Sequence, residues 1–560
     1  MRACLAALCP GVRFIAMLFF AVSFSASTPA QSPSQPSVDL PPATASAASP
    51  SPAKPPAPAA PLPPIKAALQ LYREGKFSEA EAAYSAILKD DPASSSAYVG
   101  LARVQLKQKR VDAAADSVAK AVKLSPNSDE VQVMQGELAF RQGHIADAER
   151  LFTPIIRKGA AGDARANLGL GRVYWVSSYY RHAKLQFDLA YEKDKDDPDI
   201  RRAWMNTLSL KERVSALRDY LSGDSDDDEE SREHMHAGLT LLEDAEGEGR
   251  SGCHIVSRPA EVHLPMERLM YSAKNIRGYG LKLDVNGVKA TLLLDTGASG
   301  IVISRKVAER AGIKSIVSSD VHGIGDKGPV SSFFGIADSM KVGGLELQGC
   351  HVSVIERNSV ADEDGLIGAD VFSSYLVNIN FPDYKFELTA LPPRPPDSEQ
   401  DKALLAKFPK IQRFHDRFTP PEMKDWSPVY RFGHMLLIPT RINDAPTLNL
   451  FLIDTGAFSD TISPQVARQF TKVHDDDHMK VKGLNGNVAR VFSADEIKLQ
   501  FSHFRQPAVG MVAFDTSHIS DRAGTEISGM LGFAMLYQMQ LKIDYRDGLV
   551  DFVYDPNRFH

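Results

Sequence analysis

The tetrapeptide Asp-Thr-Gly-Ala occurs twice in this 560-residue chain, each time directly after a run of large apolar residues. The first copy begins at Asp295 and the second at Asp454. An apolar run of this kind predicts a buried strand, and the glycine predicts a tight turn that presents the carboxylate at the end of the strand. Because the motif is built twice, we expect two halves of one site in which the two carboxylates meet.

The chemistry of such a pair is specific. Two carboxyl groups held about 3 Å apart cannot both ionise at low cost, so one pKa rises and the other falls. The pair then holds one proton and can act as general base and general acid in the same turnover. It can activate a water that attacks an amide carbonyl, and we expect neither a cofactor nor a metal. Which aspartate carries the proton stays open, because a coupled pair titrates as a unit.

The net charge and the N-terminal residues indicate which partners and which location to expect. The formal net charge is −6, which implies neither nucleic acid nor an acidic membrane surface as a partner. Arg2 and Arg13 precede an apolar run from Phe14 to Ala26, which predicts a signal peptide at 1–30 and export to a periplasmic or extracellular space. We expect no stable membrane span in the mature chain.

Two cysteines follow this signal segment, Cys253 and Cys350. In an oxidising compartment they can form a disulfide. Two unrelated buried thiols fit the sequence equally well, so both alternatives stay open.

Residues 31–64 are dominated by Pro, Ala and Ser and predict an extended linker. From 65 to 220 the sequence repeats every 34 or 35 residues, with small residues in two columns and large ones in a third. This spacing resembles that of tetratricopeptide repeats, which pair helices and offer a groove to a protein partner. The small columns are Ala68, Ala102, Gly136, Gly171 and Ala80, Ala114, Ala148, Ala183; the large column is Tyr72, Leu106, Phe140, Trp175.

An acidic run at 224–230 predicts a solvated linker over 221–255. Short β-branched and aromatic runs follow, which predict an all-β region. We divide it into a first lobe at 256–392, an inter-lobe linker at 393–428 and a second lobe at 429–560. The segment from His474 to His478 has metal-ligand residue types, but its polar surroundings favour a solvated loop.

The two lobes repeat the same order of features. A hairpin signal precedes each aspartate, at Asn286-Gly287 and at Asn443-Asp444. A glycine-bearing hairpin follows each one, and then an apolar pair between glycines. The hairpins carry Gly323, Ile324, Gly325 and Gly483, Leu484, Gly486; the apolar pairs lie within Gly365–Gly368 and Gly529–Gly532.

This ordered set resembles the retropepsin-like aspartic proteases, over roughly 270–390 and 430–556. The resemblance implies two tandem acid-protease β-barrel lobes with Asp295 and Asp454 as the catalytic pair. It implies that Thr296, Gly297, Ala298 and Thr455, Gly456, Ala457 support the active-site loops, and that the glycine-bearing hairpins are flaps over the substrate. Pepsin-like enzymes usually carry Ser or Thr in place of Ala298 and Ala457, so we expect a pH optimum less acid than pepsin's.

The sequence therefore predicts an exported aspartic-type endopeptidase that acts on a peptide or protein substrate. Its repeats would recruit the substrate or a protein partner. Two alternatives stay open at this point: a catalytically inactive peptide-binding scaffold with protease-like lobes, and a protease that is active only as a homodimer.

Overall fold

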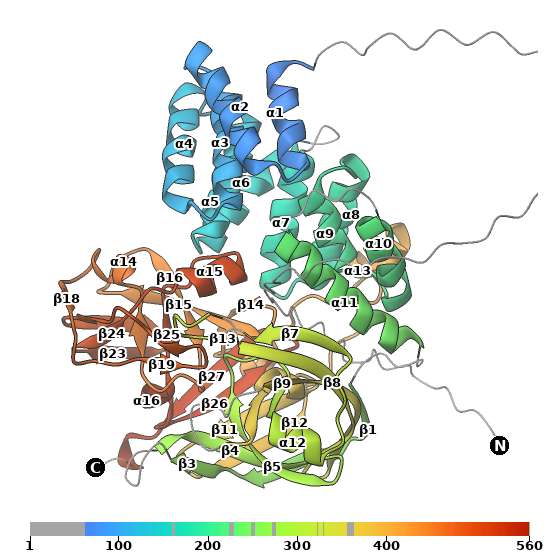
Figure 1. The fold of residues 1–560 in the computed structure, drawn as a ribbon, viewed down its shortest axis with the longest axis vertical. Helices are drawn as coiled ribbons and strands as arrows, with labels where there is room; N and C mark the ends of the chain where they lie inside the picture. Colours follow the sequence, from blue (N-terminus) through green and yellow to red (C-terminus); the bar gives the residue numbers. More distant parts are fainter. Residues whose placement is uncertain are drawn as a thin grey trace, which may run out of the picture.

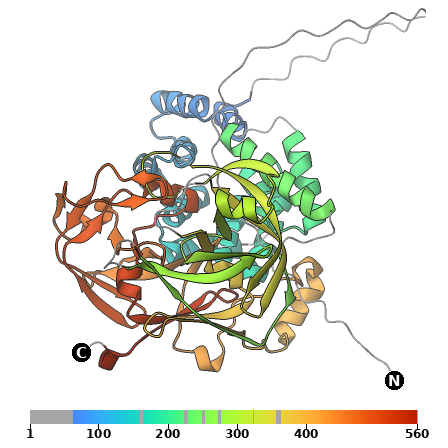
Figure 2. The ribbon, with the colours of Figure 1, turned by 60° about the horizontal axis from the view of Figure 1, so that its bottom comes forward.

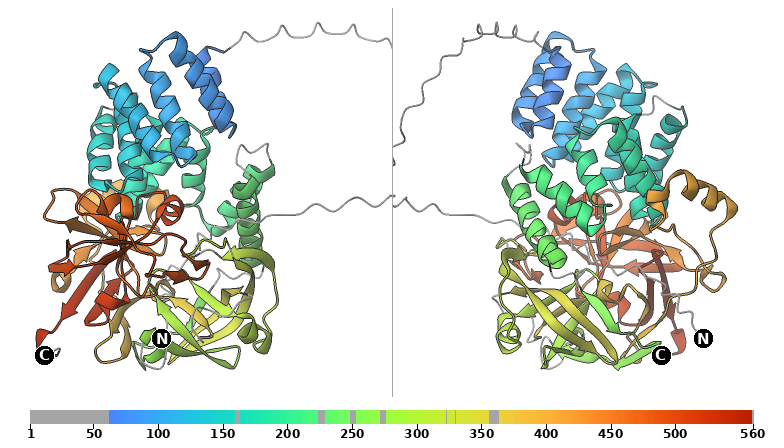
Figure 3. Two further views of the ribbon diagram at one scale, coloured as in Figure 1. Left: turned by 60° about the vertical axis from the view of Figure 1, so that its left-hand side comes forward. Right: turned by 90° about the vertical axis from the view of Figure 1, so that its right-hand side faces the viewer.

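The computed structural model describes residues 62–158, 163–222, 229–247, 253–270, 276–321, 323–328, 330–355 and 363–558. In this part of the chain an array of helices lies against one side of two β lobes (Figures 1 and 3). The predicted fold class is confirmed: an all-α repeat array precedes an all-β bilobal half. The predicted signal peptide and nearly all of the predicted linker at 31–64 lie outside the described residues.

Eight helices form four antiparallel pairs within 64–193. The small columns allow the helices of a pair to approach closely. A Cβ at Gly136 would lie 2.6 Å from the ring of Phe152, and Ala80, Ala114 and Ala148 are fully buried. The helices are α1 (Pro64–Arg73), α2 (Phe77–Asp90), α3 (Ser95–Lys107), α4 (Val111–Leu124), α5 (Asp129–Arg141), α6 (Ile145–Arg157), α7 (Ala164–Val176) and α8 (Tyr180–Lys193).

The segment that we expected to be an acidic linker is helical over much of its length. After α9 (Pro198–Met205) and α10 (Leu210–Ser222), helix α11 covers Glu229–Gly247. The linker prediction is corrected here because α11 has an apolar side as well as acidic residues. Leu239 is buried in a cluster with α10 residues, which supplies the tertiary packing that a helix of this polarity needs.

The first lobe is built on a sheet in the strand order β1-β9-β6-β10-β5-β4-β8-β7, with β3 paired to β4. Strand β5 ends at Asp295 and runs parallel to β10, with Gly368 opposite Asp295. The elements are β1 (His254–Ser257), β3 (Glu267–Met270), β4 (Ile276–Val285), β5 (Val288–Asp295), β6 (Ile301–Ser304), α12 (Arg305–Arg310), β7 (Val317–Val321), β8 (Val330–Val342), β9 (Leu345–Ile355) and β10 (Gly365–Gly368).

The second lobe repeats this arrangement in the order β18-β21-β24-β17-β25-β16-β15-β22-β23, with β14 paired to β15. Strand β16 runs parallel to β25 as β5 does to β10, and Asp454 follows it directly. The elements are β14 (Tyr430–Phe432), β15 (Met435–Ile442), β16 (Leu448–Ile453), β17 (Thr461–Ile462), α14 (Pro464–Ala467), β18 (Val473–Asp475), β21 (Phe492–Ala494), β22 (Ile497–Phe501), β23 (Phe504–Ala508), β24 (Met511–Ala513), α15 (Ser517–Ala523), β25 (Gly529–Leu531) and α16 (Phe533–Leu536).

A third sheet joins the lobes (Figure 2). Each lobe contributes its closing strand pair, and β11 of the first lobe pairs with β26 of the second. One apolar core runs through both lobes as a result, which fixes the two aspartate-bearing strands relative to each other. The order is β13-β27-β26-β11-β12-β2, made of β2 (Glu261–Pro265), β11 (Tyr375–Asn380), β12 (Lys385–Ala390), β13 (Ser427–Pro428), β26 (Met539–Asp544) and β27 (Leu549–Tyr554).

The helical array and the second lobe share a core. Phe152 and Val173 of the repeats lie in one buried cluster with Leu450 and Met530 of the lobe. The backbone amide of Glu526 donates to the carbonyl of Arg141 at 2.8 Å. The repeats are therefore packed onto the protease-like half rather than tethered to it.

The segment between the lobes also binds the repeats. It contains α13 (Glu399–Lys407), and the guanidinium of Arg181 in α8 donates to Asp397 and to the carbonyl of Phe414 at 3.0 and 3.1 Å. His182 contacts Asp416 through Nδ1. Residues 393–428, which we expected only to link the lobes, thus also hold α8 in place.

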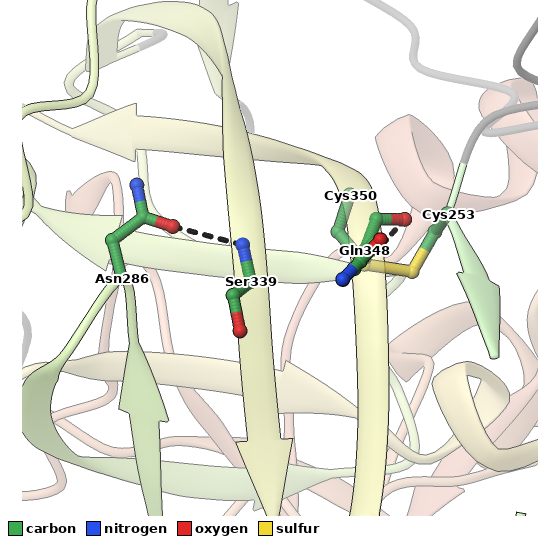
Figure 4. The surroundings of a disulfide bond; sticks show 5 residues. All are labelled: Cys253, Asn286, Ser339, Gln348 and Cys350. Atoms are coloured by element: carbon green, nitrogen blue, oxygen red, sulfur yellow. Dashed lines mark hydrogen bonds between the residues drawn. A yellow bond between two sulfur atoms is a disulfide. The ribbon is translucent and has the colours of Figure 1, made fainter. Parts of the chain in front are cut away.

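Cys253 and Cys350 form a disulfide (Figure 4). It ties the residue before β1 to β9 of the first lobe, beside the point where these two strands pair. The alternative of two unrelated thiols is therefore removed. Within the described part of the chain, no helix is both long and apolar enough to cross a membrane.

Candidate active site

The two Asp-Thr-Gly-Ala loops meet where the lobes face each other. Thr296 and Thr455 exchange hydrogen bonds across the interface: each backbone amide donates to the other threonine's Oγ1 at 3.0 Å. Each hydroxyl then donates to a carbonyl of the opposite strand, Thr296 to Ile453 at 2.8 Å and Thr455 to Leu294 at 2.9 Å. Both threonines are buried, so these four bonds lock the loops in a fixed relative position.

The two glycines let the carboxylates approach each other. A Cβ added at Gly297 would lie 2.6 Å from Cγ of Asp454, and one at Gly456 would lie 2.1 Å from Oδ2 of Asp295. These separations leave no room for any side chain. Asp295 and Asp454 therefore face each other across the paired loops, as the sequence predicted.

Backbone donors hold the carboxylates unequally. Asp295 Oδ1 accepts from the amide of Gly297 at 2.8 Å. Asp454 Oδ1 accepts from the amides of both Gly456 and Ala457, each at 2.9 Å. Because amide donors stabilise the ionised form, two donors against one favour the negative charge on Asp454 and the shared proton on Asp295.

Burial, together with the neighbouring Asp454 carboxylate, raises the pKa of Asp295 to about 8. Burial also raises the pKa of Asp454 above its ordinary 3.8, while the Ala457 and Gly456 amides and Arg277 oppose that rise. Both pKa values are therefore raised, whereas the contact alone predicts that one of them falls; burial of both carboxyl groups accounts for the difference.

A cationic or polar side chain from each lobe reaches across to the other lobe's loop. Arg277 of β4 donates to the carbonyl of Gly456 at 2.6 Å. His434, just before β15, donates through Nε2 to the carbonyl of Gly297 at 3.2 Å. The two are equivalent by position, since Arg277 lies nine residues before Asn286 and His434 nine before Asn443.

This pair makes the two sides of the site chemically different. Arg277 carries a fixed positive charge near both carboxylates. Burial lowers the pKa of His434 below 6.5, against the opposing effect of Asp370, so the imidazole is neutral near pH 7. Asp370 itself accepts from the Ser299 hydroxyl at 3.2 Å and the Gly300 amide at 3.0 Å, which holds the first loop from behind.

The second lobe supports its active-site loop with a similar hydrogen bond, but there the carboxylate belongs to the loop and the amide to the residue after β25. Ala534 takes the place of Asp370 in the second lobe, but Asp460, in the loop itself, accepts from the amide of Gly532 at 2.8 Å. Burial raises the pKa of Asp460 to about 6. The lobes therefore differ in which segment carries the carboxylate and which carries the amide, but each active-site loop keeps one such hydrogen bond.

The two flaps contact each other over the carboxylates. The hairpin of β7 and β8 carries one tip, and β19 (Lys482–Gly483) with β20 (Gly486–Asn487) carries the other. Asn485 of the second tip donates its backbone amide to the carbonyl of Ile324 at 2.9 Å and its side chain to the carbonyl of Gly328 at 2.7 Å. The tips interlock tightly.

The predicted flap residues all lie at this crossing. A Cβ at Gly483 would lie 2.2 Å from the carbonyl oxygen of Ile324, and one at Gly325 would lie 2.4 Å from the backbone of Asn485. Gly323 lies against Leu484, and Gly486 against the side chain of Lys327. The structure thus brings every predicted loop and flap residue to one place.

A cavity of about 1430 Å³ runs from the flaps and the carboxylates to the helices of the repeats. Both aspartates line it, as do Ile324, Leu484 and Phe458. This volume exceeds the roughly 300–1,000 Å³ of typical small-molecule sites, which suits a larger ligand such as a polypeptide segment.

Sequence reasoning missed three residues of this site: Arg277, His434 and Asp460. Arg277 and His434 could have been detected from their equal spacing to the hairpin signals. They did not stand out as an equivalent pair because their residue types differ. The candidate metal segment at His474 is separate from the carboxylates; His474 lies 3.1 Å from Asp495. Among the described residues no group of three His, Cys, Asp or Glu side chains is placed to hold a metal ion.

Comparison with known proteins supports the two-part organisation. A family model described as aspartyl protease matches residues 281–371 and again 438–535. A tetratricopeptide repeat model matches 65–129 and 133–198. No curated protein matches the chain.

Among solved structures, the aspartic proteinase from Irpex lacteus is similar at 14% sequence identity and a TM-score of 0.31, covering 54% of this chain and 99% of that one. The two family matches carry the assignment, because each falls on the elements and loops described above. The chain thus carries a tetratricopeptide-repeat region followed by two copies of an aspartyl-protease domain, the retropepsin-like arrangement that its sequence resembles.

Proposed function

We propose that this protein is an aspartic-type endopeptidase with a single active site, to which each lobe contributes one catalytic aspartate. The observation that carries the proposal is the contact of Asp295 and Asp454 across the glycines of the paired loops. Two buried carboxylates at this separation, beneath two flaps and beside a peptide-sized cavity, are suited to amide hydrolysis.

In the proposed reaction a water between the carboxylates loses a proton to the ionised Asp454 as its oxygen attacks the amide carbon. Asp295 donates its proton to the carbonyl oxygen, which gives a neutral tetrahedral diol. Breakdown then returns the hydroxyl proton to Asp295 as the C–N bond breaks, while Asp454 protonates the leaving amine. The dyad ends the cycle with one proton, as it began.

We also propose that the protein is exported to a periplasmic or extracellular space. The disulfide between Cys253 and Cys350 supports this location, because such bonds persist in oxidising compartments.

The test is cleavage of a diverse peptide library by purified protein, with the cleaved bonds mapped by mass spectrometry. Because both aspartates lie in one chain, we expect specific activity to stay constant on dilution. The alternative of an obligate homodimer predicts that specific activity falls as the protein is diluted. The alternative of an inactive scaffold predicts no cleavage at any concentration.

The pH dependence follows from the carboxylate pair. A dyad with one proton is active, so kcat/KM should fall as the pH rises through about 8 and Asp295 ionises. It should also fall on the acid side as Asp454 gains a proton, at a pH above the ordinary 3.8 because burial raises its pKa. We expect a bell-shaped profile of kcat/KM, and a maximum below about pH 3 would contradict this account of the coupled pair.

A further inference from the structure

The cavity over the carboxylates extends onto the helices of the repeats. Its lining includes residues of α3, α5 and α7 as well as both aspartates and both flaps. Helix α15 of the second lobe lies where the two parts join, directly below α5 in Figure 1. A chain bound along the repeats can therefore enter the active site without leaving the cavity.

The lining residues of the repeats occupy equivalent positions in successive units. Positions 103 and 107 of α3, 137 and 141 of α5, and 172 and 176 of α7 all line the cavity. Residues four apart share one side of a helix, so this side of α3, α5 and α7 faces the cavity; we call it the repeat face. It also carries Leu106, Phe140 and Trp175, which belong to the column of large residues.

The repeat face is strongly cationic. Seven Lys and Arg residues of the repeat region line the cavity, against two carboxylates, Glu137 and Asp199. Five of the seven cations have carboxylate partners: Arg103 pairs with Glu137, Lys107 and Arg202 with Asp199, Arg165 with Asp197 and Asp199, and Arg141 with Asp521 of the second lobe. The excess of positive charge remains after these pairs are formed.

Two of these cations face the cavity without an ion pair among the described residues: Arg172 of α7 and Lys109, just after α3. Lys480 and Lys482 at the second flap line the same cavity. Positive charges thus extend from the repeat face toward the flap. Charges in a concave, partly dehydrated surface attract an oppositely charged chain more strongly than charges on an open surface do.

We propose that the substrate is a polypeptide with an acidic segment, and that this segment binds the repeat face while a neighbouring peptide bond lies between Asp295 and Asp454. This inference rests on the proposed function and adds the class of substrate. The occupant is the substrate itself, because the repeat face and the carboxylates line one cavity. Leu106, Phe140 and Trp175 accommodate apolar residues interspersed with the acids.

The first test compares fluorogenic peptides that share one cleaved sequence and differ in a tail of Glu and Leu, Lys and Leu, or Ser and Gly. Each tail is placed before or after the cleaved bond. We expect an acidic tail on one side to raise kcat/KM by about tenfold over the neutral tail, mainly by lowering KM, because close charge pairs in an interface contribute coupling energies of at least this size. Equal kcat/KM for all tails would overturn the inference.

The variants are Arg172→Glu with Lys109→Glu, and the milder Arg172→Gln in case charge reversal disturbs folding. The ratio of kcat/KM between acidic and neutral tails should fall toward one in these variants. Lys123→Glu is the matched control, since Lys123 is an exposed residue of α4 outside the cavity lining, and it should keep the wild-type ratio. An unchanged ratio in both Arg172 variants contradicts the assignment.

A binding measurement separates this inference from the proposed function. Fluorescence anisotropy follows a labelled Glu-Leu peptide on the full chain carrying Asp454→Asn, where cleavage does not interfere. We expect binding that weakens as salt rises, because salt screens the charges, and that Arg172→Gln reduces. If the Glu-Leu peptide binds but the wild type cleaves no peptide, the proposed protease function is wrong and the binding of acidic segments stands. If the wild type cleaves peptides without any preference for acidic ones, the protease function stands and the inferred acidic substrate is wrong.

Discussion

Replacing Asp454 with asparagine is expected to lower kcat by at least about a thousandfold, because a positioned acid or base contributes roughly 10²–10⁴ to a rate and this residue serves in both roles. The asparagine oxygen can still accept from the amides of Gly456 and Ala457. The loop should therefore keep its shape while the site loses its shared proton. Asp295→Asn should have a similar effect, measured as single-turnover cleavage of a fluorogenic peptide.

Asp338→Asn is a suitable control, since Asp338 is an exposed residue of β8 outside the cavity lining and should keep wild-type activity. Circular dichroism and thermal unfolding should show that the two dyad variants are folded. Burial raises the pKa of both carboxyl groups, so removing one should not reduce stability. Wild-type cleavage rates in Asp295→Asn and Asp454→Asn would refute the dyad.

The repeats and the duplicated lobes could be predicted because their signals are local. Ala80 and Ala114 are spaced by one repeat, and each is fully buried between the helices of its own pair. The same holds for the sequence around each aspartate, where an apolar strand, a glycine turn and a flap follow one another within a short stretch. Patterns of this kind depend on residues that are close in the chain, so they can be recognised from the sequence alone.

Contacts between distant segments could not be predicted in this way. Arg277 and Gly456 are 179 residues apart, and nothing near either of them indicates the other. The shared core of the repeats and the second lobe has the same character: Phe152 indicates a buried helix, and Leu450 of the same cluster indicates only a strand. Which surfaces meet depends on the folded shape of both parts, so the common cavity became visible only in the structure.

Helix α11 shows a second reason why the sequence-based prediction failed in places. Its acidic residues are typical of a solvated linker, yet Leu239 and Ala245 are buried. A few apolar positions with helical spacing were enough for packing against the preceding helices, and the charge run concealed them. Charge composition indicates that a segment is solvated on one side, which is compatible with a helix.

Gly456→Ala should lower kcat by between about a hundredfold and a thousandfold, because displacing a reacting group by 1 Å already costs roughly a hundredfold. The added Cβ would lie 2.1 Å from Oδ2 of Asp295 and 2.3 Å from its Cγ. The loop cannot yield easily, since Thr455 beside it is fixed by two bonds across the interface. The Asp295 carboxylate must therefore move away from Asp454, and the pair should lose its shared proton.

Gly344→Ala tests whether the effect belongs to the site. Gly344 lies in the turn between β8 and β9, and a Cβ there would meet its nearest atom, Cγ of Pro259, at 3.7 Å, an ordinary contact. This variant should match wild type in kcat and in thermal unfolding. Separated carboxylates should also titrate as independent groups, so the basic limb of the pH profile of Gly456→Ala should move to lower pH as Asp295 loses the raising effect of Asp454. A Gly456→Ala enzyme with normal kcat and an unshifted profile would show that the close approach of the two carboxylates is not needed for catalysis.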